Sequence, residues 1–339
     1  MEILLLFISL ILILLAAELF VNSVEWLGKI LKLSEGAVGS ILAAIGTALP
    51  ETLIPIIALL SGDKAQASEI GIGAILGAPL MLSTLTMFVT GCAVIGFKHR
   101  RKHKDKVVVN SEVVGHDLKF FIFSFTLALI CGFIPNSLEN IKVVIAAILV
   151  LSYFIYVIKL VKENNENESD LPNLYFAFGN KKIMKHKYVI IIVVIQLLLA
   201  LALIVTGAQI FVDSLTYVSI LLGIPAFVLA IILTPIATEL PEKFNSVIWI
   251  SREKDTLALG NITGAMMFQA SILPAIGILL TDWSLASIGT FLSALIAIVS
   301  ATLLYLELRA KKHMTVKMLL TCGLFYLLFL ILVFTGIIR

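Results

Sequence analysis

Two short stretches of the chain, 191 residues apart, carry nearly the same oxygen-bearing side chains beside a proline. They read Gly-Thr-Ala-Leu-Pro-Glu at 46–51 and Ala-Thr-Glu-Leu-Pro-Glu at 237–242. Each lies in the middle of an apolar segment that is long enough to cross a bilayer. A carboxylate at that depth is energetically costly, so it indicates a functional site.

The side chains of the two stretches predict a site for a hard cation. Proline interrupts helical hydrogen bonding and releases carbonyl oxygens, which at membrane depth must line a cavity or meet ions. Thr47 and Glu51 add a hydroxyl and a carboxylate in the first stretch. Thr238 and Glu242 add the same pair in the second. Such oxygen ligands suit Ca²⁺ or Na⁺ better than soft metals. The alternative is a proline kink whose carboxylate pairs with Lys243 or another helix.

The elements that must position these residues are membrane-spanning helices. Hydrophobic residues make up 60% of the chain and charged residues 14%, whereas soluble proteins contain about 25% charged residues. Continuous apolar runs of about 20 residues predict an all-α membrane protein, because a β-barrel would show short alternating segments. The ten predicted transmembrane helices occupy residues 3–27, 37–61, 68–97, 116–134, 138–160, 188–213, 221–250, 256–281, 284–307 and 315–337.

The basic residues predict the orientation of these helices. All but four of the 25 Lys and Arg residues lie in or beside alternate loops of the ten-helix arrangement. These loops are 28–36, 98–115, 161–187, 251–255 and 308–314. The positive-inside rule makes that face cytoplasmic and places both termini outside the cell membrane. The basic cluster at 98–106 is interpreted as a topology determinant, with binding of anionic lipid headgroups as the alternative.

An internal repeat relates the two halves of the chain. The offset of 191 also aligns residues 20–23 with 211–214, and an offset of 187 aligns Gly73 and Gly77 with Gly260 and Gly264. Each copy contains five spans, and an odd number predicts that the second copy enters the membrane from the opposite side. The predicted organisation is a first repeat at 1–160, a cytoplasmic linker at 161–187 and a second repeat at 188–339. The second and seventh helices are predicted to be discontinuous at their prolines.

These motifs resemble those of the cation/Ca²⁺ exchanger superfamily, the sodium/calcium exchangers and their prokaryotic relatives. The family repeats read like Gly-Thr-Ser-Leu-Pro-Glu, each followed by a span that begins Gly-Asn-x-x-Gly-Ser-Asn. Here the matching stretches are 46–51 with 73–79 and 237–242 with 260–266. The resemblance implies a secondary-active antiporter that moves Ca²⁺, or a similar cation, by alternating access in exchange for Na⁺ or H⁺.

The resemblance also implies the roles of the motif residues. Ca²⁺ would lie between Glu51 and Glu242, and Thr47 and Thr238 would contribute further oxygens. The transported inorganic cations and the lipid bilayer are the expected partners. Enzymatic activity, a cofactor and nucleic-acid binding are not expected.

The chain departs from the family pattern at positions that complete the flanking Na⁺ sites of sodium-coupled members. Serines and amides of the motifs are replaced at Ala48, Ala74, Ala78, Leu82, Glu239 and Ala265. The second copy keeps amide side chains at Asn261 and Gln269, which are further candidate ligands. The usual sodium stoichiometry is therefore in question.

Glu239 is the departure with the largest chemical consequence. It lies three residues before Glu242, so the two carboxylates share a helix face. With Glu51 nearby, one of the three acids is expected to hold a proton unless a cation neutralises them. This favours a proton-coupled exchanger that has lost its sodium sites, although Glu239 could instead pair with Lys243. A cation channel and a non-transporting homologue remain as alternatives.

Overall fold

The computed structural model describes residues 2–30, 49–60, 64–163, 173–176, 186–284 and 287–338. These described residues are mostly helical and include one pair of two-residue antiparallel strands, which joins Lys106 to Thr315 and Val107 to Met314. The elements are α1 (Glu2–Ile30), α4 (Leu49–Leu60), α5 (Lys64–Met81), η2 (Leu82–Thr86), α6 (Met87–Gly96), η3 (Lys98–Arg100), β1 (Lys106–Val107), α7 (Ser111–Cys131), η4 (Asn136–Leu138), α8 (Glu139–Glu163), α9 (His186–Leu222), α10 (Ala226–Ser251), α11 (Asp255–Leu280), α12 (Ile288–Lys311), β2 (Met314–Thr315) and α13 (Val316–Phe334).

Eight of the described helical segments are long and apolar enough to cross a membrane. They coincide with eight of the ten predicted spans, so the prediction of a multi-pass membrane protein is confirmed. Shorter apolar helices at Glu51–Leu60 and Ala226–Ile236 fall within the predicted second and seventh spans. Because residues 31–48 lie outside the described part, the total of ten transmembrane helices stays a prediction.

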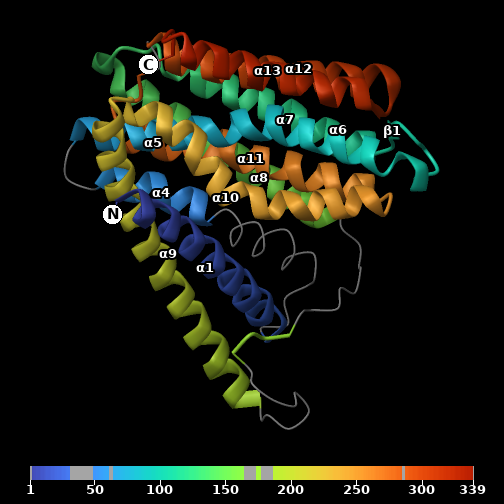
Figure 1. Cartoon of the computed structure of the whole chain (residues 1–339), viewed down its shortest axis with the longest axis horizontal. Coiled ribbons are helices and arrows are strands. Elements are labelled where there is room, and N and C mark those ends of the chain that lie inside the picture. Colours follow the sequence, from blue (N-terminus) through green and yellow to red (C-terminus); the bar gives the residue numbers. More distant parts are fainter. Residues whose placement is uncertain are drawn as a thin grey trace.

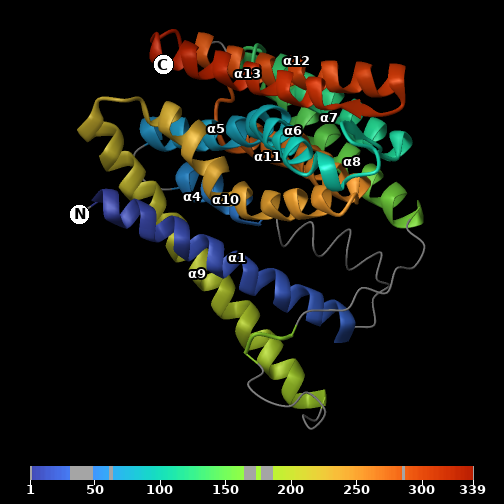
Figure 2. The same cartoon turned by 45° about the vertical axis from the view of Figure 1, so that its right-hand side comes forward.

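The helices form a bundle with an oblique pair along one side. Helices α1 and α9 pack against each other and run obliquely to the other helices, away from one side of the bundle (Figures 1 and 2). Helices α12 and α13 lie at the opposite edge, and α5, α10 and α11 lie between the two edges. Both chain ends lie towards the same end of the bundle. Helix α9 runs to Leu222, so it is longer than the predicted sixth span.

The prediction of a discontinuous seventh helix is wrong. Helix α10 is one helix from Ala226 to Ser251 and continues through Pro235 and Pro241. It changes direction near its middle (Figures 1 and 2). A proline removes one backbone hydrogen bond and bends a helix, and neighbouring helices can keep the bent helix continuous. The predicted break in the second helix falls before α4, outside the described residues.

An irregular turn that the sequence analysis did not anticipate lies in the third span. Between α5 and α6 the backbone forms the π-helix η2, which begins three residues after Pro79. The Ser83 hydroxyl donates to the Pro79 carbonyl at 2.8 Å, and the Ser300 hydroxyl of α12 donates to the Ser83 carbonyl at 2.7 Å. These two bonds give the Pro79 and Ser83 carbonyls side-chain partners at the irregular turn, and the second joins it to α12.

Two glycines bring α5 and α10 into direct backbone contact. A Cβ atom on Gly73 would lie 2.7 Å from the Phe227 carbonyl oxygen, and one on Gly77 would collide with the Ile231 carbonyl oxygen. Close contact through small residues is a common way for membrane helices to associate. The contact holds the first half of α10, which leads into the motif at 237–242, against α5.

The described part of the predicted linker packs against the oblique helix pair. The Asn22 side chain donates to the Asn173 carbonyl and accepts from the Tyr175 amide, both at 3.2 Å. The Tyr175 hydroxyl donates to Glu18 at 2.7 Å. This hydrogen bond, with partial burial, raises the pKa of Tyr175 to about 12. Residues 173–176 are therefore attached to α1, which a freely solvated linker would not be.

Candidate functional site

Three helices bring the candidate ligands into the interior. Helix α4 carries Glu51 in its first turn, and it contacts both α10 and α11. Glu51 is 4% exposed, and Glu239 of α10 is 1% exposed. Two carboxylates are thus buried in the apolar bundle from different halves of the chain. Burial of this kind requires compensation by hydrogen bonds, by a proton or by a cation.

Two of the predicted site residues, Glu239 and Gln269, are joined directly in the structure. The Gln269 side-chain nitrogen donates a hydrogen bond to the Glu239 carboxylate across the α10–α11 interface. Gln269 is 2% exposed, and its amide oxygen has no hydrogen-bond partner among the described residues. An amide in this position can hold a carboxylate with its nitrogen and still offer its oxygen to a cation or to an acidic proton.

Two threonines one turn apart on α10 add hydroxyl oxygens. Thr238 is 5% exposed and donates to the Thr234 carbonyl at 3.1 Å, so its oxygen keeps its accepting capacity. Thr234 is 2% exposed, and its own hydroxyl has no hydrogen-bond partner in the part of the chain that the structure describes. Thr234 was not among the site residues predicted from the sequence. Its spacing of four residues from Thr238, which places both on one helix face, could have identified it.

The remaining predicted residues are placed differently. Thr47 lies outside the described residues, and Glu242 lies in α10, although its side chain is not described. Asn261 lies two turns of α11 before Gln269 and lines a separate cavity, so the structure does not bring it to Glu239. No group of three or more His, Cys, Asp or Glu side chains that could hold a metal appears among the described residues. The predicted cluster of three acids is untested, because it requires Glu242.

The cavity beside Asn261 has a volume of about 1250 Å³ and lies between α7, α8, α11 and α12. Its polar interior includes Asp117, which is 2% exposed and accepts a 2.6 Å hydrogen bond from Thr263. Arg309 and Lys312 line the end near the predicted cytoplasmic loops. Asp117 was not among the predicted site residues, although it is an acid within the predicted fourth span.

The comparisons with known proteins agree with this architecture. A family model described as "Sodium/calcium exchanger protein" matches residues 1–162 and 192–335. The fold is similar to that of the H⁺/Ca²⁺ exchanger CAX, with a TM-score of 0.75 and 16% identity over 98% of this chain and 82% of that one. It is also similar to the sodium-calcium exchanger NCX_Mj, with a TM-score of 0.58 and 20% identity over 96% of each chain.

The family match covers both halves of the chain, and the two solved structures share its fold along nearly its whole length. The resemblance first noted in the two proline-glutamate motifs is thereby confirmed. The chain belongs to the sodium/calcium exchanger protein family, and it is a multi-pass membrane transporter of the cation/Ca²⁺ exchange type and not an enzyme.

Proposed function

We propose that this protein exchanges Ca²⁺ for protons and that Glu239 carries the exchanged proton. The observation that carries the proposal is the burial of Glu239, 1% exposed, against the amide of Gln269. Sodium-coupled relatives are expected to place a hydroxyl at this position of the motif. A carboxylate there replaces a neutral Na⁺ ligand by a group that can bind and release a proton.

The geometry of Gln269 suits both protonation states of Glu239. An ionised carboxylate accepts from the amide nitrogen, as observed. A protonated Glu239 could in addition donate its O–H to the Gln269 oxygen, which has no hydrogen-bond partner among the described residues. Acid and amide would then form a doubly hydrogen-bonded pair. Such a pair satisfies the buried groups when no cation is bound.

The same site would bind Ca²⁺ when the proton leaves. We assign the ion to Glu51 and Glu242, with oxygens from Thr47, Thr238 and Gln269. Binding of a divalent cation favours the ionised form of every nearby carboxylate. Arrival of Ca²⁺ and departure of the Glu239 proton are therefore coupled by charge. Asn261 would act on the path between this site and the cytoplasm.

Alternating access would follow from two inverted repeats, at 1–160 and 188–339. Reciprocal packing supports this arrangement. Helix α11 of the second half contacts α7 and α8 of the first, while α5 and α6 of the first half contact α12 and α13 of the second, respectively. From the position of the basic loops we also infer that this is a cell-membrane protein whose two termini are extracytoplasmic.

Transport by purified protein in proteoliposomes tests the coupling ion. We expect an imposed pH gradient to drive Ca²⁺ uptake and an imposed Na⁺ gradient to have no effect. Glu51→Gln and Glu242→Gln should abolish uptake. Glu239→Gln should retain Ca²⁺ binding but release fewer protons per Ca²⁺, while Glu139→Gln, an exposed carboxylate of α8, serves as the matched control.

Two results would contradict the proposal. Uptake driven by Na⁺ and not by protons would show sodium coupling. An unchanged ratio of protons to Ca²⁺ in Glu239→Gln would remove Glu239 from the exchange. Uptake that needs no counter-ion at all would instead indicate a channel.

A further inference from the structure

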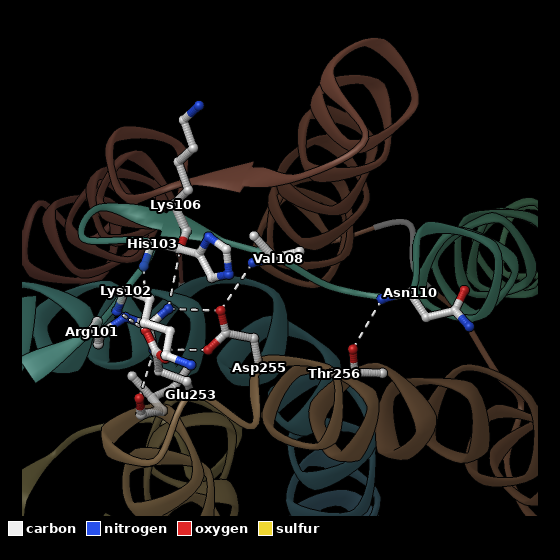
Figure 3. Close-up of polar contacts among 10 residues, drawn as sticks. Arg101, Lys102, His103, Lys106, Val108, Asn110, Glu253, Asp255 and Thr256 are labelled. Atoms are coloured by element: carbon white, nitrogen blue, oxygen red, sulfur yellow. Dashed lines mark hydrogen bonds and ion pairs between the residues drawn. The ribbon is translucent and has the colours of Figure 1, made fainter.

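A buried ion pair joins the two halves of the chain at the predicted cytoplasmic end. Arg101 follows η3, and Asp255 is the first residue of α11 (Figure 3). Two parallel hydrogen bonds connect the guanidinium to the carboxylate, with N–O distances of 2.8 and 2.7 Å. The side chains are 0% and 2% exposed. Arg101 is therefore buried between the two halves of the chain, unlike the exposed Lys102 and Lys104 of the same basic cluster.

Backbone groups supply further hydrogen bonds to this pair. Arg101 also donates to the carbonyl of Ile250 at 2.6 Å and to that of Lys106 at 3.1 Å. Asp255 accepts from the amide of Val108 at 2.9 Å. The loop after α6 is thus attached to the last turn of α10 and to the first turn of α11. We call the Arg101–Asp255 pair with these three backbone groups the clasp.

The clasp holds the end of α10 and the start of α11, the two helices that carry the candidate proton site. Gln269 lies 14 residues after Asp255 on α11, which corresponds to about 21 Å along the helix axis. A rotation of α11 by about 5° at its base would move Gln269 by about 1.8 Å. Hydrogen bonds tolerate variation of only about 0.5 Å. The Glu239–Gln269 contact therefore depends on how the α10–α11 turn is held.

Stability alone does not explain a charged pair in this position. Removing two ions from water costs about as much as their attraction returns, and apolar residues of similar size often stabilise a protein equally well. A bidentate Arg–Asp pair adds a defined geometry that apolar side chains lack. The Ser246 hydroxyl, 3.3 Å from the Ala258 carbonyl, also joins α10 to α11 near the same end.

We propose that Arg101 and Asp255 are positioning residues for exchange, because they set the angle at which α10 and α11 present Glu239 and Gln269. This inference rests on the proposed role of that site, but it does not depend on which ion drives transport. The first half of the chain thereby controls the geometry of ligands that belong to the second half.

Asp255→Asn and Arg101→Lys test the clasp. The first removes the charge, and the second keeps the charge but loses the bidentate geometry. Lys311→Gln is the matched control, because Lys311 forms an ion pair with Glu307 at the same end but is 52% exposed. Ca²⁺ uptake is measured against Ca²⁺ concentration and normalised to folded protein, under a proton gradient and separately under a Na⁺ gradient.

We expect the KM for Ca²⁺ to rise about tenfold in Asp255→Asn, to rise less in Arg101→Lys and to stay unchanged in Lys311→Gln. A purely structural pair would lower the yield of folded protein and leave KM unchanged, and that result would overturn the inference. If Asp255→Asn does not fold, the Arg101→Lys variant decides, and a KM equal to that of the wild type would overturn the inference. Transport by the wild type under Na⁺ alone would refute proton coupling, while the KM comparison would still decide the role of the clasp.

Discussion

Replacement of Gln269 by leucine removes the described hydrogen-bond donor to Glu239 with little change in side-chain volume. Leucine already stands at the equivalent position of the first repeat, Leu82, where it is fully buried in a helical span. The variant should therefore fold. It leaves the ionised form of Glu239 without the hydrogen bond from the amide nitrogen, while protonated Glu239 loses only a neutral partner.

The expected rise in KM follows from the difference in strength between a hydrogen bond to the ionised carboxylate and one to the protonated carboxyl group. A hydrogen bond to a charged group contributes about 2 kcal/mol, and a neutral one contributes about 1 kcal/mol or less. Because Ca²⁺ favours the ionised form of Glu239, up to about 2 kcal/mol of binding is lost, which corresponds to a KM about 30-fold higher. The part of the loss that comes from proton competition should shrink as the pH is raised, since fewer protons then compete with Ca²⁺. Loss of the Gln269 oxygen as a Ca²⁺ ligand adds a part that does not depend on pH.

The assay is Ca²⁺ uptake into proteoliposomes at several values of pH, with Gln196→Leu as the control. Gln196 is also a fully buried glutamine in a membrane helix, but it binds the Leu19 carbonyl and Asn22 at the α1–α9 interface. The control should lose thermal stability and keep its KM. An equal change of KM in both variants, or a pH-independent change in Gln269→Leu, would refute the reasoning.

Two further predictions concern α10. Thr234→Val should keep the fold, because it replaces a hydroxyl that has no hydrogen-bond partner among the described residues. The variant should raise the KM for Ca²⁺ several-fold if the Thr234 oxygen faces the ion. An unchanged KM would exclude Thr234 as a ligand. Gly77→Ala should lower the unfolding temperature and the transport rate, because its Cβ would collide with the Ile231 carbonyl oxygen, at a cost of about 1–3 kcal/mol. Gly96→Ala is its control, because the new Cβ would meet no atom from another part of the described structure within 4 Å. Equal stability of the two variants would contradict the described helix contact.

The sequence predicted the features that depend on composition and local pattern. Apolar runs of sufficient length located eight of the helical spans, and the repeated proline-glutamate motif led to the family. The Glu239–Gln269 contact could not be derived, because it depends on how α10 and α11 are rotated about their axes. Helical periodicity places a residue on a face, but it does not say which neighbour that face meets.

Two other features escaped prediction for different physical reasons. The effect of a proline on a helix depends on whether neighbouring helices support the bend, so the continuity of α10 was not visible in its sequence. Arg101 is one of several basic residues in a short run, and its neighbours Lys102 and Lys104 are exposed. Its burial is decided by Asp255, which lies 154 residues away.

The length of α9 has a consequence for the surrounding lipid. Its apolar part, Tyr188–Leu222, contains 35 residues and is therefore about 52 Å long, whereas the hydrocarbon core of a bilayer is about 30 Å thick. To bury this stretch fully, α9 would need a tilt of about 55°, well above the range of about 0–40° that is common for membrane helices. Hydrophobic mismatch thus acts on the α1–α9 pair, and α9 packs directly against α4, which carries Glu51. Bilayer thickness is thereby linked mechanically to the position of a carboxylate in the interior.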